Sequence, residues 1–146
     1  MIEYGLLEKS EAPALIRLYE QLNPGVDGSV PEGLLADILE RSALFGIQVY
    51  VARDAGRIVG SCYICVIPNL SHNGRSIGYI ENVVTDENYR RRGIGRELIG
   101  RALAWAKAQN CYKAVLESGI ARTGAHAFYR ALGFDEASHK TFEIRF

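Results

Sequence analysis

Four arginines and two glycines are concentrated in the stretch 89–96, which reads Tyr-Arg-Arg-Arg-Gly-Ile-Gly-Arg and is called here the arginine–glycine turn. A strand-like run at 79–85 precedes it, and a helix-like run at 97–106 follows it. The first amides of a helix lack intrahelical partners, and the helix dipole adds partial positive charge there. Glycine lets a phosphate approach the backbone, and the forked donors of arginine suit phosphate oxygens. The stretch therefore predicts a pyrophosphate site.

Two common phosphate-binding motifs do not fit this turn. A P-loop needs Lys-Ser or Lys-Thr after its second glycine, and that pair is absent from the sequence here. A dinucleotide fingerprint needs a third glycine three residues after the second, where this chain has Leu98. The pattern that is present is Arg-x-x-Gly-x-Gly at 90–95. An ordinary basic turn at the start of a surface helix is the alternative interpretation.

In this strand–turn–helix context the pattern resembles the acetyl-CoA motif of the GNAT N-acetyltransferase superfamily. The resemblance covers nearly the whole chain and is firmest from 79 to 134. It implies that acetyl-CoA is the cosubstrate, with no metal. It also implies that the end of the strand pairs with the pantetheine arm and offers an amide to the thioester carbonyl, as an oxyanion hole does. The implied CoA-binding residues are Val83, Val84, Thr85, Arg90, Arg91, Arg92, Gly93, Ile94, Gly95 and Arg96.

Acetyl transfer to an amine by direct attack in a ternary complex needs a base and an acid. Glu81 is the first candidate base, because a half-buried strand carboxylate tends to a raised pKa. Strand alternation places Glu81 and Val83 on one face. Glu117, at the end of a later strand, is the second candidate. Tyr129 is the candidate acid, since Phe-Tyr-x-x-x-Gly-Phe at 128–134 resembles the segment whose tyrosine protonates the departing thiolate in the family.

Other reactive side chains carry weaker signals. His126 is three residues before Tyr129 on a predicted helix, and His72 lies in the loop before the Glu81 strand. An isolated histidine is more often structural or solvated. Cys62 and Cys65 have the spacing of a metal or redox pair, but residues three apart on a strand point to opposite faces. Buried structural thiols are therefore expected.

The composition limits the range of partners. The chain has 146 residues, with 17 Lys and Arg against 17 Asp and Glu, so its formal net charge is zero. A general nucleic-acid or anionic-membrane binder would carry a basic excess. No apolar run approaches membrane-spanning length, and the first residues lack the features of a signal peptide. A cytoplasmic protein with one domain, 1–146, that binds neither nucleic acid nor membrane is expected.

The hydrophobic pattern predicts strands at 2–7, 47–53, 57–67, 76–85 and 113–118, with one or two more in 134–146. Helices are predicted after Ser10, after a capping box at 29–32, after the arginine–glycine turn to about 110 with Ile94, Leu98 and Ala102 among its buried residues, and from about 123 to 132. The polar link 23–28 could overhang a substrate site. This order matches an α/β (α+β) GNAT fold. Such a fold has a mixed, mostly antiparallel sheet of six or seven strands flanked by about four helices.

The acceptor amine is less defined by the sequence. The patches at 79–84, 110–113 and 144–146 resemble glucosamine 6-phosphate N-acetyltransferase, which implies an amino sugar phosphate as acceptor. Amino acids, polyamines and protein amines remain open. A CoA-binding sensor without turnover is the alternative of a different class. The resemblance also implies that terminal strands could pair between subunits of a homodimer.

Overall fold

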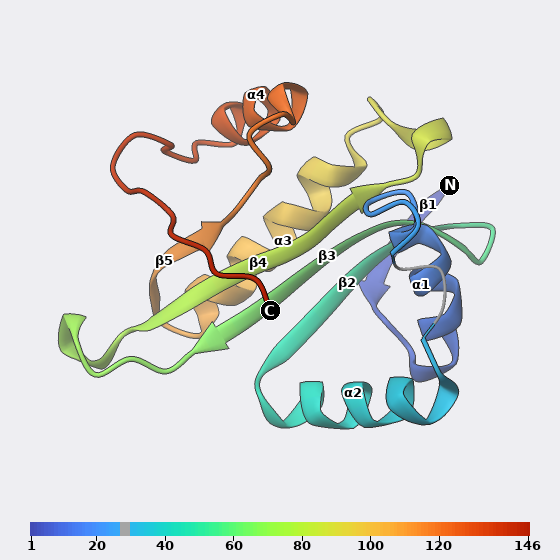
Figure 1. The fold of residues 1–146 in the computed structure, drawn as a ribbon, viewed down its shortest axis with the longest axis horizontal. Coiled ribbons are helices and arrows are strands. Elements are labelled where there is room, and N and C mark those ends of the chain that lie inside the picture. The colour runs from blue at the N-terminus through green and yellow to red at the C-terminus, as the bar shows by residue number, and fades with distance from the viewer. Residues whose placement is uncertain (27–29) are drawn as a thin grey trace. The chain divides into compact units, whose positions relative to one another are not determined.

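The strands form one sheet whose spatial order follows the sequence, β1-β2-β3-β4-β5 (Figure 1). This computed structural model describes residues 1–26 and 30–146. The strands are β1 (Ile2–Leu6), β2 (Ile47–Asp54), β3 (Arg57–Ile67), β4 (Ser76–Thr85) and β5 (Cys111–Leu116). The helices are α1 (Ala12–Tyr19), α2 (Glu32–Leu44), α3 (Ile94–Ala108) and α4 (Thr123–Ala131), with short 3₁₀ turns at Lys9–Glu11, His72–Gly74 and Glu87–Tyr89. The mixed α/β fold predicted from the sequence is confirmed, and the described residues contain five strands rather than six or seven.

The chain divides into two compact units, Met1–Val115 and Leu116–Phe146, which are described separately. The first contains β1 to β4, α1 to α3 and most of β5. The second contains α4 and the C-terminal segment.

The start of α1 differs from the prediction. Ser10 lies inside a 3₁₀ turn, and the cap is Glu8, whose side chain and that of Glu11 each bond the other's backbone. Glu11 also pairs with Arg53 of β2, and this hydrogen bond holds the pKa of Glu11 below its usual value. A reciprocal carboxylate cap and a cross-element ion pair therefore replace the predicted serine cap.

The predicted capping box before α2 lies partly outside the described residues, because it includes Ser29. The structure describes α2 from Glu32, and Pro31 precedes it without a side-chain cap. No residue of α2 is fully buried, and Leu34 and Ile38 are exposed.

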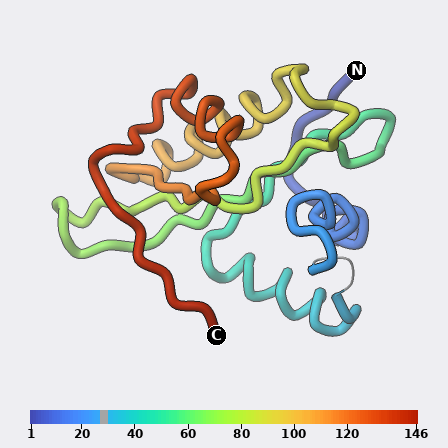
Figure 2. Tube along the Cα trace, turned by 45° about the horizontal axis from the view of Figure 1, so that its top comes forward, coloured from blue at the N-terminus to red at the C-terminus, as the bar shows by residue number. Residues whose placement is uncertain are grey.

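Helices α1 and α3 pack on opposite faces of the sheet (Figure 2). Leu15 and Leu18 of α1 form a buried cluster with Val51, Ile58 and Val84. Val51 is paired with Ser61, so Ser61 faces α1, whereas the neighbouring Gly60 faces α3. The first unit therefore has two apolar layers, with β3 and β4 between them.

Replacing Gly60 with alanine is expected to lower the free energy of unfolding by about 1–3 kcal/mol. A Cβ there would lie 2.8 Å from Cγ2 of Ile94 and 3.1 Å from Cδ1 of Leu98, both fully buried. Helix α3 would have to move away from β3. Urea denaturation of Gly60→Ala and of Gly100→Ala measures this cost, since a Cβ at Gly100 would meet nothing within 4 Å. Equal stability of the two variants would contradict the close packing of α3 on β3.

No strand forms in the described residues 134–146, which corrects the expectation of one or two terminal strands. The alternation of apolar residues is present, but Phe142, Ile144 and Phe146 are all exposed. Alternation of apolar and polar residues shows that a segment could form a strand. A strand also needs a neighbouring strand to which its backbone can hydrogen-bond. Among the described residues, no helix is long and apolar enough to cross a lipid bilayer.

Candidate active site

The arginine–glycine turn connects β4 to α3 through two residues with left-handed backbone conformations. Arg91 has φ 64° and Gly93 has φ 80°. Gly93 is the residue before α3, and its carbonyl accepts the first helical hydrogen bond from the Glu97 amide at 3.1 Å. Gly93 has no side chain to cap this helix start, while Ile94 is buried and anchors it. The turn therefore presents uncapped helix amides beside exposed arginines.

Two of the four arginines are held by contacts within the turn. Nη2 of Arg92 donates to the Asn88 carbonyl at 3.0 Å, and its guanidinium lies 4.8 Å from the centre of the Tyr89 ring. Nε of Arg90 donates to the Thr85 carbonyl at 3.4 Å. The other two, Arg91 and Arg96, are exposed and pair with no residue that the structure describes. The group is therefore a partly ordered set of four cations.

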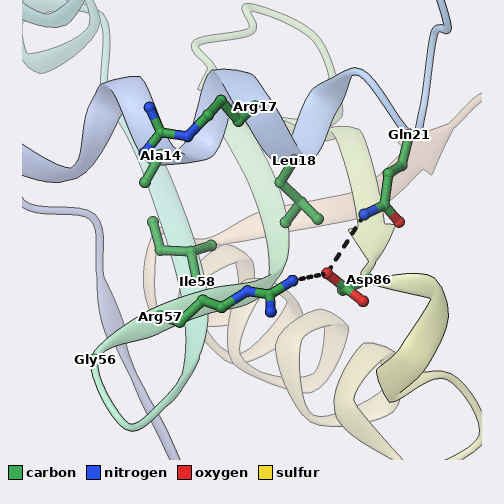
Figure 3. Close-up of a pocket in the computed structure, with 8 residues that line it drawn as sticks. All are labelled: Ala14, Arg17, Leu18, Gln21, Gly56, Arg57, Ile58 and Asp86. Atoms are coloured by element: carbon green, nitrogen blue, oxygen red, sulfur yellow. Dashed lines mark hydrogen bonds and ion pairs between the residues drawn. The ribbon is translucent and has the colours of Figure 1, made fainter.

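Asp86 fixes the beginning of the turn (Figure 3). It is 1% exposed, and its Oδ1 accepts a hydrogen bond from the Asn88 amide at 3.0 Å. Its Oδ2 accepts hydrogen bonds from Arg57 at 2.7 Å and from Gln21 at 3.4 Å. Burial raises the pKa of Asp86, but these hydrogen bonds and the Arg57 charge outweigh burial and hold the pKa below its ordinary value. The buried carboxylate is therefore ionised at neutral pH and ties β3 and the segment that follows α1 to the turn.

A surface cleft of about 490 Å³ lies beside Asp86, between α1 and the β2–β3 turn (Figure 3). Its lining residues are Ala14, Arg17, Leu18, Gln21, Gly56, Arg57, Ile58 and Asp86. None of them belongs to the arginine–glycine turn. The cleft is therefore distinct from the predicted pyrophosphate site.

Strand β4 contains a β-bulge at the predicted site. Glu81 pairs with Tyr63, and Val84 pairs with Ser61, so Asn82 and Val83 together oppose the single residue Cys62. Asn82 has φ 50°, a left-handed conformation in the middle of a strand. A bulge leaves an extra residue outside the regular ladder and turns the strand. One backbone unit next to Glu81 is thereby released from regular pairing.

The bulge corrects the predicted facing of two residues. Tyr63 and Ser61 are alternate residues of β3 and share a face, so their partners Glu81 and Val84 also share a face. Strict alternation, which places Glu81 with Val83 instead, is therefore wrong across the bulge. Glu81 is half-buried beside Tyr63, and Val84 is buried in the α1 cluster.

The end of β4 extends past its neighbour β5. The two strands are joined through α3, a connection typical of parallel strands, and Gly78 lies beside Ala114. Strand β5 ends soon afterwards at Leu116, whereas β4 continues to Thr85. Strand β5 therefore lies beside the first half of β4, and Val83, Val84 and Thr85 are in the part of β4 that continues past the end of β5.

The second unit carries the other two candidate catalytic residues. Glu117 is exposed and directly follows β5. Tyr129 is half-buried on α4, with its ring centre 5.3 Å from that of Phe128 and 6.0 Å from that of Phe134. These aromatic contacts give the Tyr129 ring a defined setting within its own unit.

The remaining candidates have structural partners. His126 bonds the Gly119 carbonyl at 2.9 Å, and His72 stacks on Tyr112 at 3.9 Å between ring centres. Cys62 is buried, and Cys65 is three residues away on an unbroken part of β3, so the two thiols face opposite sides as predicted. Among the described residues, no group of three or more His, Cys, Asp or Glu side chains is arranged to hold a metal ion.

The sequence interpretation missed the bulge and the Asp86 network. A signal for the bulge exists, because asparagine is depleted in strands and tolerates the left-handed conformation, and Asn82 interrupts a β-branched run. No comparable signal exists for Asp86. Its partners Gln21 and Arg57 are distant in sequence and meet it only through the fold.

Comparison with known proteins identifies the family. A sequence profile of the Acetyltransferase (GNAT) family matches residues 12–134. Glucosamine 6-phosphate N-acetyltransferase of Trypanosoma brucei brucei is 33% identical over 135 residues, which are 91% of this chain and 88% of that protein. A crystal structure of an acetyltransferase from Trypanosoma brucei is 30% identical, with a TM-score of 0.88 and coverage of 100% of both chains. Aminoglycoside N(6')-acetyltransferase type 1 of Serratia marcescens is 32% identical over 66 residues, 45% of each chain. The chain therefore belongs to the GNAT family of acetyl-CoA-dependent N-acetyltransferases.

Proposed function

We propose that this enzyme transfers the acetyl group of acetyl-CoA to the primary amine of an amino sugar, with an amino sugar phosphate as the preferred acceptor. The observation that carries the proposal is the course of β4. Strand β4 carries a bulge at Asn82 and Val83, pairs with β3 as far as Thr85, and is followed by a turn that leads to an arginine-rich helix start. One extended ligand with a pyrophosphate near its middle fits such a path.

The arginine–glycine turn would hold the CoA pyrophosphate. The amides that begin α3 donate to its oxygens, and Arg90, Arg91, Arg92 and Arg96 supply the opposing charge. Gly93 and Gly95 leave the backbone open to the phosphate. The braced positions of Arg90 and Arg92 support this assignment, because less side-chain freedom is lost when a ligand binds to ordered groups.

The end of β4 would hold the pantetheine arm as an added strand would be held. Peptide-like groups of the arm pair with the backbone at Val83, Val84 and Thr85, on the edge that continues past β5. The backbone unit released by the bulge would donate to the thioester oxygen as negative charge develops there. Buried packing of the Val84 side chain is compatible with this role, because only its backbone contacts the ligand.

The reaction is a direct attack. The amine nitrogen bonds to the thioester carbon, and the carbon–sulfur bond breaks as the tetrahedral intermediate collapses. Glu81, directly or through a water, takes the proton from the nitrogen, with Glu117 as the second candidate. Tyr129 gives its proton to the departing CoA thiolate.

The cysteines support direct attack over an acetyl-cysteine intermediate. Burial raises the pKa of Cys62 to about 12 and also raises the pKa of Cys65 and of Cys111. A nucleophilic cysteine needs its thiolate at neutral pH. All three thiols are instead held protonated.

The acceptor class rests on two relatives with different acceptors of one chemical kind. One acts on glucosamine 6-phosphate and the other on aminoglycosides, and both acceptors are amino sugars. Thiol release from acetyl-CoA, measured across glucosamine 6-phosphate, glucosamine, an aminoglycoside, polyamines, amino acids and peptides, tests the proposal. The highest kcat/KM is expected with glucosamine 6-phosphate. A higher kcat/KM with a peptide amine would favour protein acetylation over amino sugar acetylation. Binding of acetyl-CoA without turnover of any amine would favour a CoA-binding sensor.

Replacing Glu81 with glutamine is expected to lower kcat by about 10²-fold, near the low end of the range for a positioned general base. The rate of the unmodified enzyme should rise with pH as this carboxylate loses its proton, and the variant should lose that ionisation from its pH–rate profile. Glu117→Gln is the matched control, and its pH–rate profile should keep that ionisation. If the profile of Glu81→Gln matches that of the unmodified enzyme, Glu81 is not the base.

A further inference from the structure

Tyr89 connects the arginine–glycine turn to the β2–β3 hairpin. Its hydroxyl donates a hydrogen bond to Oδ2 of Asp54 at 2.9 Å. Asp54 is the last residue of β2 and pairs with Ile2 of β1 and with Arg57 of β3, so the sheet fixes its backbone. The hydrogen bond to Asp54 also raises the pKa of Tyr89 above its ordinary value, so the phenol keeps the proton that it donates. The acceptor is therefore a carboxylate on a rigid element.

The backbone of Tyr89 is held near the same hairpin. Its amide donates to the Asp86 carbonyl at 2.8 Å, and the 3₁₀ turn Glu87–Tyr89 ends at this residue. The Asp86 carboxylate accepts a hydrogen bond from Arg57, the first residue of β3. Asp54 and Arg57 flank the hairpin turn, and each bonds one end of the segment 86–89. Tyr89 is therefore fixed through both its backbone and its hydroxyl.

The ring of this tyrosine lies against the guanidinium of Arg92. The guanidinium carbon is 4.8 Å from the ring centre, which is within the range of a cation–π contact. Nη2 of Arg92 also donates to the Asn88 carbonyl at 3.0 Å, so a ring and a carbonyl hold one exposed cation. An arginine without such contacts samples many rotamers, and it loses this freedom when it binds a ligand. The contacts therefore order Arg92 in advance.

We propose that Tyr89 is a positioning residue of the pyrophosphate site, which orders the Arg92 guanidinium before acetyl-CoA binds. The hydrogen bond to Asp54 fixes the ring, and the ring fixes the cation. This inference rests on the proposed binding of the CoA pyrophosphate by the arginine–glycine turn. Tyr89 does not touch CoA in this account. It acts through Arg92, so it affects acetyl-CoA affinity and leaves the chemical step unchanged.

Tyr89→Leu removes both the ring and the hydroxyl. It is expected to raise KM and Kd for acetyl-CoA about fivefold, because ordering one long side chain on binding costs about 1 kcal/mol. Its kcat should stay within about twofold of that of the unmodified enzyme, since the lost binding is shared by the ground state and the transition state. An unchanged Kd, or a kcat that falls as much as the affinity, would overturn the proposal.

Tyr4→Leu is the matched control for Tyr89→Leu. Tyr4 is on β1, and the guanidinium carbon of Arg101 on α3 lies 5.2 Å from its ring centre. Neither residue belongs to the proposed site, so this variant should keep the Kd and kcat of the unmodified enzyme. An equal loss of acetyl-CoA affinity in Tyr4→Leu would overturn the proposal, because the effect would then not depend on the position of the arginine.

Tyr89→Phe isolates the contribution of the hydroxyl. It keeps the ring beside Arg92 and removes only the hydrogen bond to Asp54. Its Kd for acetyl-CoA is expected to rise about two- to threefold, since the ring is still present but less fixed. A Kd equal to that of the unmodified enzyme would overturn the role of the Asp54 hydrogen bond.

A double-mutant cycle shows whether Tyr89 acts through Arg92. Arg92→Gln removes the cation that the ring orders. In that background, Tyr89→Leu should change the Kd for acetyl-CoA by less than about twofold, because the contact partner is already absent. A full fivefold effect in both backgrounds would show that Tyr89 acts elsewhere in the turn.

A second readout needs no ligand. NMR relaxation of the Nε–H group of each arginine reports its order in the free enzyme, and Arg91 is an internal reference because it is exposed and pairs with no residue that the structure describes. The order of Arg92 should exceed that of Arg91 in the unmodified enzyme and fall to the same level in Tyr89→Leu. Equal order in the unmodified enzyme would overturn this inference alone. Absence of acetyl-CoA binding by the unmodified enzyme would instead overturn the proposed function and this inference with it.

Discussion

Gly93→Glu is expected to weaken acetyl-CoA binding by at least about 10²-fold. A Cβ at Gly93 would meet nothing within 4 Å, so the effect does not come from a clash. It comes from a carboxylate placed where the pyrophosphate should bind, and from the backbone, since an L-residue would leave φ 80° in the free protein and would have to regain it on binding at a cost of roughly 1–2 kcal/mol. Together they amount to about 3 kcal/mol, and each 1.4 kcal/mol is a factor of ten in Kd. Isothermal titration with acetyl-CoA measures the change.

Gly100→Glu is the control for Gly93→Glu. It makes the same chemical change at an exposed position inside α3, where the backbone is helical and a Cβ has open space. Its acetyl-CoA affinity should stay within about twofold of that of the unmodified enzyme, because exposed charges away from the ligand are screened by salt. Equal losses of acetyl-CoA affinity in both variants would show that the effect comes only from the added negative charge. Unchanged affinity in Gly93→Glu would remove the pyrophosphate assignment.

Tyr129→Phe is expected to lower kcat between about 10²- and 10³-fold, as loss of a general acid does, with acetyl-CoA affinity nearly unchanged. The ring contacts with Phe128 and Phe134 remain in the variant, so the helix should keep its packing. Stopped-flow measurement of the chemical step, together with equilibrium binding of acetyl-CoA, separates the two quantities.

Tyr112→Phe is a suitable control for Tyr129→Phe. Its ring stacks on His72 near the beginning of β5, and it has no role in the proposed reaction. It should keep full kcat. If Tyr129→Phe loses affinity and turnover to the same extent, the residue binds CoA rather than donating a proton.

Elements with a strong local pattern could be predicted from the sequence. A helix was expected after the arginine–glycine turn, and Ile94, Leu98 and Ala102 are buried in α3 as their spacing indicates. The β2–β3 hairpin was also predicted, because Asp-Ala-Gly separates two β-rich runs. In these elements the local preference and the tertiary packing agree.

The features that the sequence could not define depend on contacts between distant residues. Glu8 rather than Ser10 caps the first helical turn, and the neighbouring Glu11 is fixed by Arg53 of β2. Beyond the bulge, the side chains of β4 point to the opposite face from the one that strict alternation predicts. The sequence pattern, which assumes strict alternation, cannot show this change. The residues proposed to bind acetyl-CoA could thus be predicted from the sequence more easily than the contacts that hold them in place.

The central claim is that the acetyl group passes directly from CoA, held along β4, to the amine. Initial velocities measured against acetyl-CoA at several fixed concentrations of glucosamine 6-phosphate, or of the amine with the highest kcat/KM, test it most directly. Intersecting lines in the double-reciprocal plot are predicted, because both substrates must be bound before the carbon–sulfur bond breaks. Parallel lines, together with an acetylated enzyme detected by mass spectrometry in the absence of amine, would contradict the account.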